Sequence, residues 1–175
     1  MREIQLTQGL VALVDDEDFE TLSVYKWCAH RSYENGSFYA VRRDVNIAPG
    51  VPGKIIKMHQ MLLGERPGYE IDHEDNNGLN NQRYNLRFLT HSRNLANIPK
   101  RSGEYSSIYK GVSYDKERNR WAAYIGGKPR IFIGRYSTEE QAAKMYDKVA
   151  LYRFGDAVKL NFPVLLKEQQ QLATT

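Results

Sequence analysis

The chain has 175 residues and a formal net charge of +4, and 41% of its residues are hydrophobic and 11% aromatic. This length fits one large domain or two small ones. The single cysteine, Cys28, excludes an intrachain disulfide and a cysteine-based zinc finger. The sequence has no apolar run long enough to span a membrane, and its first residues lack the apolar stretch of a signal peptide. We therefore expect a soluble, cytoplasmic protein.

Charge is divided unevenly along the chain. Residues 1–99 contain 11 Lys and Arg against 13 Asp and Glu, whereas residues 100–163 contain 13 against 7. The second part therefore carries a net charge of +6. Such an excess indicates a polyanionic partner, most simply nucleic acid, although a solvated basic surface would give the same imbalance.

Short strands and turns are predicted along the first half. Residues 4–18 have the pattern of two strands around a glycine turn, followed by an acidic loop. Residues 27–43 predict a β-hairpin, because an Asn-Gly pair separates two aromatic-rich, partly alternating runs. After a Pro/Gly loop at residues 46–53, residues 55–64 predict a strand that runs into a short helix, which Gly64 closes.

A second strand pair and a short helix are expected next. Residues 65–73 have the pattern of a turn that leads into a strand, and residues 86–90 that of its partner. Residues 90–97 predict a short helix with Thr90 as its N-cap. The polar segment at residues 98–107 contains Pro and Gly and precedes the change in charge balance, so it is the predicted domain boundary.

Three strands and one long helix are predicted in the second half. The strands are expected at residues 109–114, 120–127 and 130–136. In the helix, Ser137 and Glu140 form a capping-box pattern, and Gly155 is the expected stop. The buried face of the helix is predicted from residues at helical spacing: Ala142, Ala143, Tyr146, Val149, Ala150 and Arg153. A short segment is expected to pack back after the helix.

Polar residues around the predicted second strand pair form a candidate metal site. Asp72 ends the first strand, His73 follows it, and Asn94 lies in the short helix. A carboxylate and an amide oxygen are hard ligands that suit one Mg²⁺ or Mn²⁺ ion. His73 has the chemistry of a general base near neutral pH, and Asn85 is the candidate for fixing its tautomer. Because neighbouring side chains on a strand point to opposite faces, Asp72 and His73 straddle the site unless the strand bends there.

These residues and their spacing resemble the HNH endonucleases of the ββα-metal class, in the branch of phage homing endonucleases. The Asp-His pair is followed by one Asn 13 residues after the Asp and by another 22 residues after it, as in that branch. The resemblance implies that Asp72 and Asn94 bind the metal. It also implies that His73 activates water and that Asn85 orients His73. The run at residues 81–87 matches the loop that frames the site in that family.

Hydrolysis of a DNA phosphodiester is the reaction that this resemblance implies. His73 takes a proton from the attacking water, while the divalent ion neutralises charge in the transition state and assists the leaving 3′ oxygen. Three arginines are candidates for holding neighbouring phosphates: Arg83, Arg87 and Arg93. The segment at residues 58–64 is similar to the one that leads into the motif in that branch, yet His59 is expected to make a structural hydrogen bond.

Each part of the motif also has a structural alternative. Asp-His is a common dipeptide, Asn-rich runs usually form turns, and an Asn in a helix is usually exposed. His30 and His91 are expected at the surface or at a cap, and contact of His91 with DNA beside Asn94 is the alternative. Cys28 follows Trp27 in a predicted strand and is expected in the core.

The predicted sheet of the second half buries one face on its helix and leaves the other face free to enter a DNA major groove. Candidates for the free face alternate basic and aromatic types: Lys110, Tyr114, Arg118, Arg120, Tyr124, Arg130 and Phe132. The alternative is a packing module with a basic rim.

Residues 107–163 resemble the DNA-binding domain of plant ethylene response factors, which also occurs fused to phage HNH nucleases. The matching segments lie at residues 109–112, 120–125, 130–151 and 157–163. Plant members place several Arg and Trp on the first and third strands, whereas the matching positions here keep the charge only at Lys110 and Arg130. The resemblance therefore implies phosphate contacts, but not the GC-rich preference of the plant members.

These patterns together predict an α+β protein with two domains. The first is a ββα-metal (HNH) nuclease domain with an N-terminal β-hairpin region, and the second is a small three-stranded antiparallel sheet packed on one helix. The predicted limits are 1–99 for the nuclease domain with its motif at about 69–98, 100–106 for a linker, 107–163 for the DNA-binding domain and 164–175 for a flexible tail.

The expected function is that of a metal-dependent endonuclease of homing or mobile-element type, which acts on double-stranded DNA as a monomer without a membrane or an obligate protein partner. A DNA-binding regulator with an inactive nuclease motif is the alternative, and RNA cleavage is a weaker one. Residues 1–55 either lie on DNA through Arg42 and Arg43 or only support the motif. The target sequence and the choice between nicking and double-strand cutting stay open.

Overall fold

The protein divides into two compact units, Met1–His91 and Ser92–Thr175. The structure is a computed structural model, and it describes residues 1–32, 36–44, 53–100, 103–126 and 129–163. The division falls at the start of helix α3 (His91–Asn97), so most of this helix is grouped with the second unit. The linker predicted at residues 100–106 lies after it and stays a prediction.

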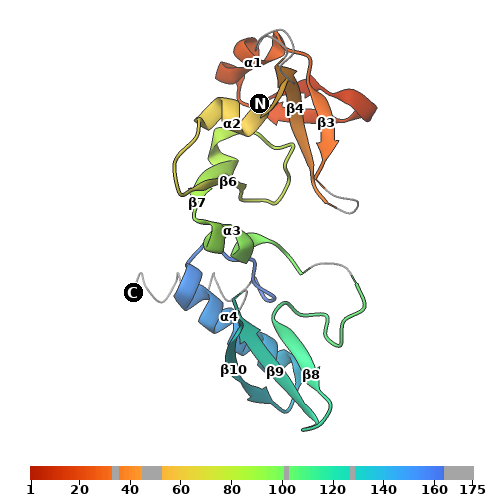
Figure 1. The fold of residues 1–175 in the computed structure, drawn as a ribbon, viewed down its shortest axis with the longest axis vertical. Coiled ribbons are helices and arrows are strands. Elements are labelled where there is room, and N and C mark those ends of the chain that lie inside the picture. The colour runs from red at the N-terminus through yellow and green to blue at the C-terminus, as the bar shows by residue number, and fades with distance from the viewer. Residues whose placement is uncertain (33–35, 45–52, 101–102, 127–128, 164–175) are drawn as a thin grey trace. The chain divides into compact units, whose positions relative to one another are not determined.

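The first unit consists of small antiparallel sheets and short helices (Figure 1). Its elements are β1 (Arg2–Gln5), the 3-10 turn η1 (Thr7–Gly9), β2 (Val11–Val14), α1 (Asp16–Ser23), β3 (Cys28–Arg31), β4 (Phe38–Asp44), β5 (Lys54–Lys57), α2 (Met58–Leu63), β6 (Glu70–His73), the 3-10 turn η2 (Arg83–Asn85) and β7 (Leu86–Leu89). Strands β1–β2 and β6–β7 pair as hairpins, and β3, β4 and β5 form a three-stranded sheet.

Most strands that the sequence predicted in this unit are confirmed. The hairpin expected at residues 27–43 is β3–β4, and β5 runs directly into α2, which ends at Gly64. Asn35 of the predicted turn and residues 46–52 of the predicted loop lie outside the described residues. The core of the unit gathers apolar side chains from all of its sheets except β6–β7: Ile4, Leu6, Ala12, Val14, Leu22, Trp27, Ala29, Ala40 and Met58.

Two predictions for this unit are wrong. The acidic segment expected as a loop is helix α1, because Asp16, Glu17 and Asp18 occupy its first turn, where carboxylates stabilise the helix dipole, and Leu22 anchors it in the core. Cys28, expected in the core, is exposed. Its neighbour Ala29 is buried, and successive side chains of a strand face opposite sides.

The second unit packs one helix on one face of a three-stranded antiparallel sheet (Figure 1). After α3 its elements are β8 (Val112–Asp115), β9 (Arg120–Ile125), β10 (Ile131–Tyr136) and α4 (Glu139–Phe154). The sheet order is β10-β9-β8, and its three antiparallel strands agree with the predicted sheet. Small side chains let α4 lie close to the sheet, since Ala123 of β9 packs against Ala142 and Ala143.

The ends of α4 differ slightly from the prediction. Thr138 is the N-cap, with its hydroxyl accepting a hydrogen bond from the Gln141 amide at 3.2 Å, so the capping box at Ser137 is wrong by one residue. Gly155 ends the helix as expected, with φ of 64°. Arg153, assigned to the buried face, is exposed, and Phe154 is buried instead.

The segment after α4 packs back onto the helix, as predicted. The carboxylate of Asp147, which is fully buried, accepts hydrogen bonds from the backbone amides of Asn161 at 2.9 Å and Phe162 at 2.8 Å. These bonds attach the segment after α4 to the helix. Within the part of the chain that the structure describes, none of the helices has the length and apolar character that a membrane crossing requires.

Candidate active site

Hairpin β6–β7 presents the Asp-His pair of the first unit. Asp72 and His73 are only 7% and 5% exposed, although both are polar. In the strand register Asp72 lies opposite Arg87, and the Arg87 Nε is 2.9 Å from the Asp72 Oδ2. Because side chains alternate along a strand, His73 points to the other face of the hairpin. The two residues therefore have separate sets of neighbours.

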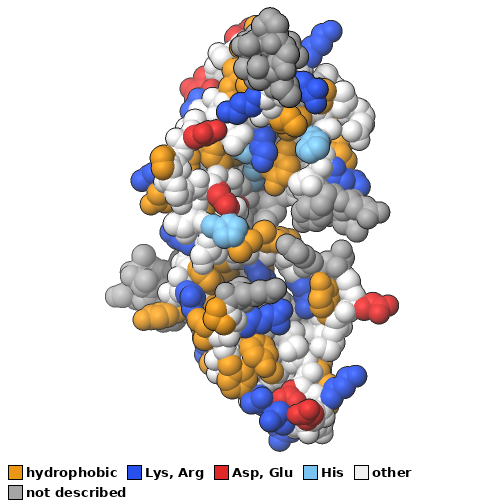
Figure 2. Space-filling model, in the orientation of Figure 1, with side chains coloured by type: hydrophobic (Ala, Val, Ile, Leu, Met, Phe, Trp, Pro, Cys, Tyr) orange, Lys and Arg blue, Asp and Glu red, His pale blue; other side chains and the backbone are white. Residues whose placement is uncertain are grey.

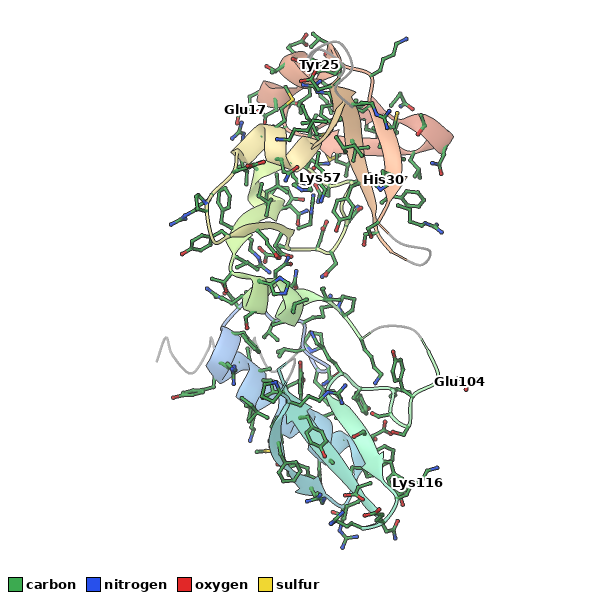
Figure 3. All side chains as sticks on the ribbon, viewed as in Figure 1. Glu17, Tyr25, His30, Lys57, Glu104 and Lys116 are labelled. Atoms are coloured by element: carbon green, nitrogen blue, oxygen red, sulfur yellow. The ribbon has the colours of Figure 1, made fainter. Side chains whose placement is uncertain are left out.

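His73 lies in a cluster of three rings. Its imidazole centroid is 4.9 Å from that of His59 in an edge-to-face arrangement, and 5.7 Å from the ring of Tyr39. Lys57, labelled in Figure 3, completes the cluster with its ammonium group over the Tyr39 ring. Burial lowers the pKa of His73 from its ordinary value, although a hydrogen bond with Asn81 acts in the opposite direction. A neutral imidazole at pH 7 follows from this shift.

His59 is the second buried imidazole of this cluster. It lies in α2, is 5% exposed and contacts both His73 and Tyr39 through its ring. Burial lowers the pKa of His59 to about 3, and electrostatic repulsion from Lys57 and from any proton on His73 acts in the same direction. The imidazole is therefore neutral as well, and it packs as a ring beside His73. The sequence had predicted a structural hydrogen bond for His59, whereas its contacts with His73 and Tyr39 are ring contacts.

Asn81 fixes the tautomer of His73. The Nε2 of His73 lies 3.4 Å from the Asn81 Oδ1, and the Asn81 Nδ2 donates to the Leu79 carbonyl at 3.2 Å. This second bond turns the amide oxygen toward the imidazole. Because an amide oxygen only accepts, the Nε2 carries the proton and the Nδ1 keeps its lone pair. The lone pair of Nδ1 is the basic site that a general base requires.

Strand β2 holds the loop that carries Asn81. The Leu13 amide donates to the Leu79 carbonyl at 2.9 Å, and the Asn81 amide donates to the Leu13 carbonyl at 2.8 Å. A parallel bridge pairs Leu13 with Asn80 between these bonds. The side chain of Asn81 is fully buried. The N-terminal hairpin β1–β2 is thus part of the framework of the site.

Asn85, the residue that the resemblance assigned to orienting His73, bonds within the same loop. Its amide nitrogen donates to the Asn80 carbonyl at 2.8 Å and to the Asp75 Oδ1 at 3.0 Å, and its amide oxygen accepts from the Asp75 backbone at 3.0 Å. Burial would raise the pKa of Asp75, but hydrogen bonds from Asn80, Asn77 and Asn85 hold it below its usual range. Asn85 thus closes the loop, and its action on His73 stays a prediction.

The three arginines predicted to hold phosphates all have carboxylate partners. Arg83 bonds Asp18 of α1 at 2.8 and 2.6 Å, and this hydrogen bond raises the pKa of Arg83 above its usual range. Arg87 pairs with Asp72. In the second unit, Arg93 lies 3.3 Å from Asp156 and also donates to the Phe154 carbonyl. Each phosphate contact would therefore compete with an internal ion pair.

The remaining histidines and the second predicted metal ligand lie outside the ring cluster. His30 and His91 are exposed, as predicted, and His91 bonds Glu70 at 2.7 Å. Asn94 belongs to α3 in the second unit, so its role at Asp72 stays a prediction. No group of three or more His, Cys, Asp or Glu among the described residues could hold a metal.

An outer sheet face in the second unit, on the side away from α4, combines aromatic and basic side chains (Figure 2). The rings of Tyr124 and Phe132 are 5.5 Å apart, and the guanidinium of Arg135 lies 4.8 Å from the Phe132 ring centroid. Arg135 also bonds Asp115 at 2.8 Å. The sequence did not single out Arg135, because simple alternation would put it on the same buried face as Ile133. The register shift between Phe132 and Gly134 turns Arg135 to the outer face.

The predicted basic residues of this unit differ in their surroundings. Arg118, Arg120 and Arg130 are exposed. Lys110 is half-buried and donates to the carbonyls of Ala96 at 2.6 Å and Ile98 at 2.5 Å. Burial lowers the pKa of Lys110 to about 8. Its ammonium group therefore holds the end of α3 rather than standing free on the sheet.

The fold and these two sites define a two-unit α+β protein with a buried Asp-His pair and a basic, aromatic sheet face. Residues 107–155 match the AP2 domain. Over 155 residues the chain is 32% identical to an uncharacterized HNH endonuclease, L560, of Acanthamoeba polyphaga mimivirus. This alignment covers 85% of this chain and 73% of the length of the mimivirus protein. The chain belongs to this family of HNH endonucleases.

Plant proteins are similar to about half of the chain. The AP2-like ethylene-responsive transcription factors PLT2 and AIL6 of Arabidopsis thaliana are 33% and 32% identical over 85 and 83 residues, which are 45% and 44% of this chain. The chain spans only 15% and 14% of the length of these two relatives. No solved structure matches the chain.

Proposed function

We propose that the protein is a metal-dependent DNA endonuclease of homing or mobile-element type, with its catalytic residues in the first unit and a DNA-binding sheet in the second. The observation that carries the proposal is the neutral, buried imidazole of His73, with its proton on the nitrogen that faces Asn81. The mimivirus relative, named an HNH endonuclease, supports it.

The donor chemistry around Asp72 fits a hard divalent cation. Its buried carboxylate already forms an ion pair with Arg87, whose Nε lies 2.9 Å from the Asp72 Oδ2. Mg²⁺ typically binds through one or two carboxylates, keeps several waters and shares substrate phosphate oxygens. Asp72 and the amide oxygen of Asn94 are the proposed ligands. When bound, the ion would neutralise charge on the phosphate and on the leaving oxygen.

His73 acts as the general base in this proposal. Its Nδ1 takes a proton from a water molecule, whose oxygen forms a bond to phosphorus as the bond to the 3′ oxygen breaks. The leaving 3′ oxygen receives a proton from solvent. Asn81 keeps the opposite nitrogen protonated, and the rings of His59 and Tyr39 limit the rotation of the imidazole. The roles of these residues are thus separate and individually testable.

The second unit supplies affinity for double-stranded DNA. Exposed basic and aromatic side chains of the outer sheet face are suited to phosphates and base edges. The proposed DNA-contacting residues are Arg118, Arg120, Tyr124, Arg130, Phe132 and Arg135. Joining this unit to the nuclease in one chain raises the effective concentration of the catalytic residues at a bound target.

A DNA-binding regulator without nuclease activity is the second candidate. The observation in its favour is the ion pair between Arg87 and Asp72, which occupies the carboxylate that the nuclease needs. The AP2 match fits both candidates, because it concerns the second unit alone.

A supercoiled plasmid assay distinguishes the two candidates. Wild-type protein is incubated with Mg²⁺ or Mn²⁺, with chelator, and alongside His73→Ala and His30→Ala. The control residue His30 lies exposed on β3, outside the ring cluster. A nuclease yields open-circle or linear DNA with wild type and His30→Ala, and none with chelator or His73→Ala. A folded wild type that shifts DNA in a gel but never cuts plasmid or genomic DNA favours the regulator.

A further inference from the structure

The second unit contains a pocket of about 270 Å³ at the start of β8. It lies at the opposite end of β8 from Lys116, which Figure 3 labels. Three basic side chains and three tyrosines contribute to its lining: Lys100, Lys110, Arg130, Tyr105, Tyr124 and Tyr146. Among the residues that the structure describes, no Asp or Glu belongs to the lining. Since one water takes up roughly 30 Å³ of liquid, the pocket is large for a single ion or water.

Tyr146 brings a hydroxyl group to this pocket. The residue is 4% exposed, and its hydroxyl forms no hydrogen bond with any described residue. Burial raises the pKa of Tyr146 to about 12, so the hydroxyl stays protonated and can donate. Gly111 lines the pocket beside it, and a Cβ there would lie 2.2 Å from the Tyr146 ring. The absence of a side chain at Gly111 thus leaves the ring undisturbed.

The two lysines have donors left over for an anion. Lys110 uses two N–H groups on carbonyls, and Lys100 uses one on the Tyr109 carbonyl at 3.0 Å. An ammonium group has three such donors. Burial lowers the pKa of both lysines, although Asp147 and Glu139 act in the opposite direction. An anion between them would offset the cost of their desolvation.

The aromatic walls indicate what else the ligand carries. The ammonium group of Lys100 lies 4.5 Å from the centroid of the Tyr105 ring. Tyr124 also belongs to the outer sheet face, where its ring lies next to that of Phe132. Aromatic side chains beside cationic groups stack bases while the cations hold phosphate. Among the described residues no ion pair involves Arg130, which stands at this pocket as a further cation.

We propose that this pocket binds a nucleotide, with its phosphate at Lys100, Lys110 and Arg130 and its base against the tyrosines. We assign the nucleotide to a DNA strand that continues from the outer sheet face, and this source rests on the proposed DNA binding. The pocket would then extend the DNA contact of the sheet face, with which it shares Tyr124 and Arg130, to Lys100, Lys110 and Tyr146.

The first experiment titrates the full-length protein, in chelator, with deoxyadenosine 5′-monophosphate and with inorganic phosphate, and follows the amide NMR signals of the pocket. The variant combines Lys100→Gln with Arg130→Gln, because Lys110 also holds α3. Lys148→Gln, on the exposed face of α4, is the control. We expect the mononucleotide to bind more tightly than phosphate. Its affinity should fall at least tenfold in the double variant and stay unchanged in Lys148→Gln. Equal binding by variant and wild type, or no shift of pocket signals, overturns the proposal.

The second experiment separates the two sources of the nucleotide. Affinity for a short duplex is measured in chelator as a function of salt. Each lost phosphate contact lowers the slope of log K against log salt by about 0.9. Lys100→Gln alone, which keeps the sheet-face residue Arg130, should therefore lose about 0.9 relative to Lys148→Gln. An unchanged slope, together with lost mononucleotide binding, assigns the pocket to a free nucleotide and overturns the DNA source. A wild type that binds no DNA refutes the proposed function, while the first experiment still decides on the pocket.

Discussion

The Nε2 of His73 lies 3.4 Å from the amide oxygen of Asn81, and the amide nitrogen of Asn81 donates to the Leu79 carbonyl. The second bond sets the direction of the first. Through this arrangement a residue without a titratable group determines which nitrogen of the imidazole is basic. The arrangement predicts that Asn81 acts on the rate of cleavage and not on the affinity for DNA.

Asn81→Leu should slow cleavage by about 100-fold, which is within the usual contribution of a positioned general base. Leu has nearly the same volume but cannot accept the Nε2 proton. Single-turnover cleavage measures the rate, and a gel shift in chelator should show unchanged DNA affinity. Asn81→Asp keeps an acceptor and should recover part of the rate. Cleavage by Asn81→Leu at the wild-type rate would refute the positioning role.

Arg87→Met should make the protein more responsive to divalent metal. It removes the cation that pairs with Asp72, so the thermal midpoint in chelator should fall, because a buried carboxylate loses its partner. Mn²⁺ should then raise the midpoint more in the variant than in wild type, since binding at 100 times Kd adds about 2.7 kcal/mol. Differential scanning calorimetry with and without metal gives both values.

Arg83→Met provides the comparison for that experiment. Arg83 pairs with Asp18 of α1, and its loss should lower the midpoint without increasing the effect of metal. If Mn²⁺ raises the midpoint of Arg87→Met no more than that of Arg83→Met, Asp72 is not a metal ligand.

His59 should make the first unit less stable in acid. The pKa of His59 is about 3 in the folded protein against an ordinary 6.5. Between pH 6.5 and pH 3 the imidazole is therefore protonated in the unfolded chain but neutral in the folded one. The stabilisation is complete above pH 6.5 and is lost as the pH falls toward 3. At pH 4 the loss approaches about 3 kcal/mol, at 1.36 kcal/mol for each pH unit.

Urea unfolding between pH 7 and 4 measures this dependence. His59→Gln should lose less stability over that range than wild type, whereas His30→Gln, at an exposed position, should follow wild type. Parallel curves for all three proteins would mean that His59 is not buried as a neutral ring.

Gly111→Ala should destabilise the second unit by about 3 kcal/mol. Gly111 has φ of 76°, and its new Cβ would lie 2.2 Å from the Tyr146 ring, so backbone strain and overpacking add. Gly126→Ala is the matched control, with φ of 87° and, among the described residues other than its chain neighbours, no atom closer than 4.0 Å. It should cost only about 1 kcal/mol. Urea unfolding followed by NMR signals of the second unit tests the difference, and equal losses would contradict the overlap.

Local patterns predicted most of the strands and α4, because each depends on residues close together in the sequence. The hairpin β3–β4 and the stop at Gly155 are examples. Helix α1 was missed because four of its eight residues are charged and only Phe19 and Leu22 mark an apolar side. The N-cap of α4 was displaced by one residue, since Ser137 and Thr138 are both good caps.

The site was predictable only in part. The Asp-His pair and the Asn-rich loop followed from spacing, and both lie in the first unit. The bond from Asn81 to His73 and the pairing of Arg87 with Asp72 depend on strand register and on the path of the loop, which no local signal encodes. The bridge between Leu13 and Asn80 joins segments far apart in the chain, and it emerges only from the fold.

That bridge has a consequence for genetic screens of this protein. Substitutions of core residues in β1 and β2, such as Ile4 or Val14, would loosen the strand that holds the loop of Asn81. They would abolish cleavage although none of them touches DNA or metal. A map of inactivating mutations should therefore extend over the N-terminal hairpin, and suppressors should include compensating changes in the loop near Leu79.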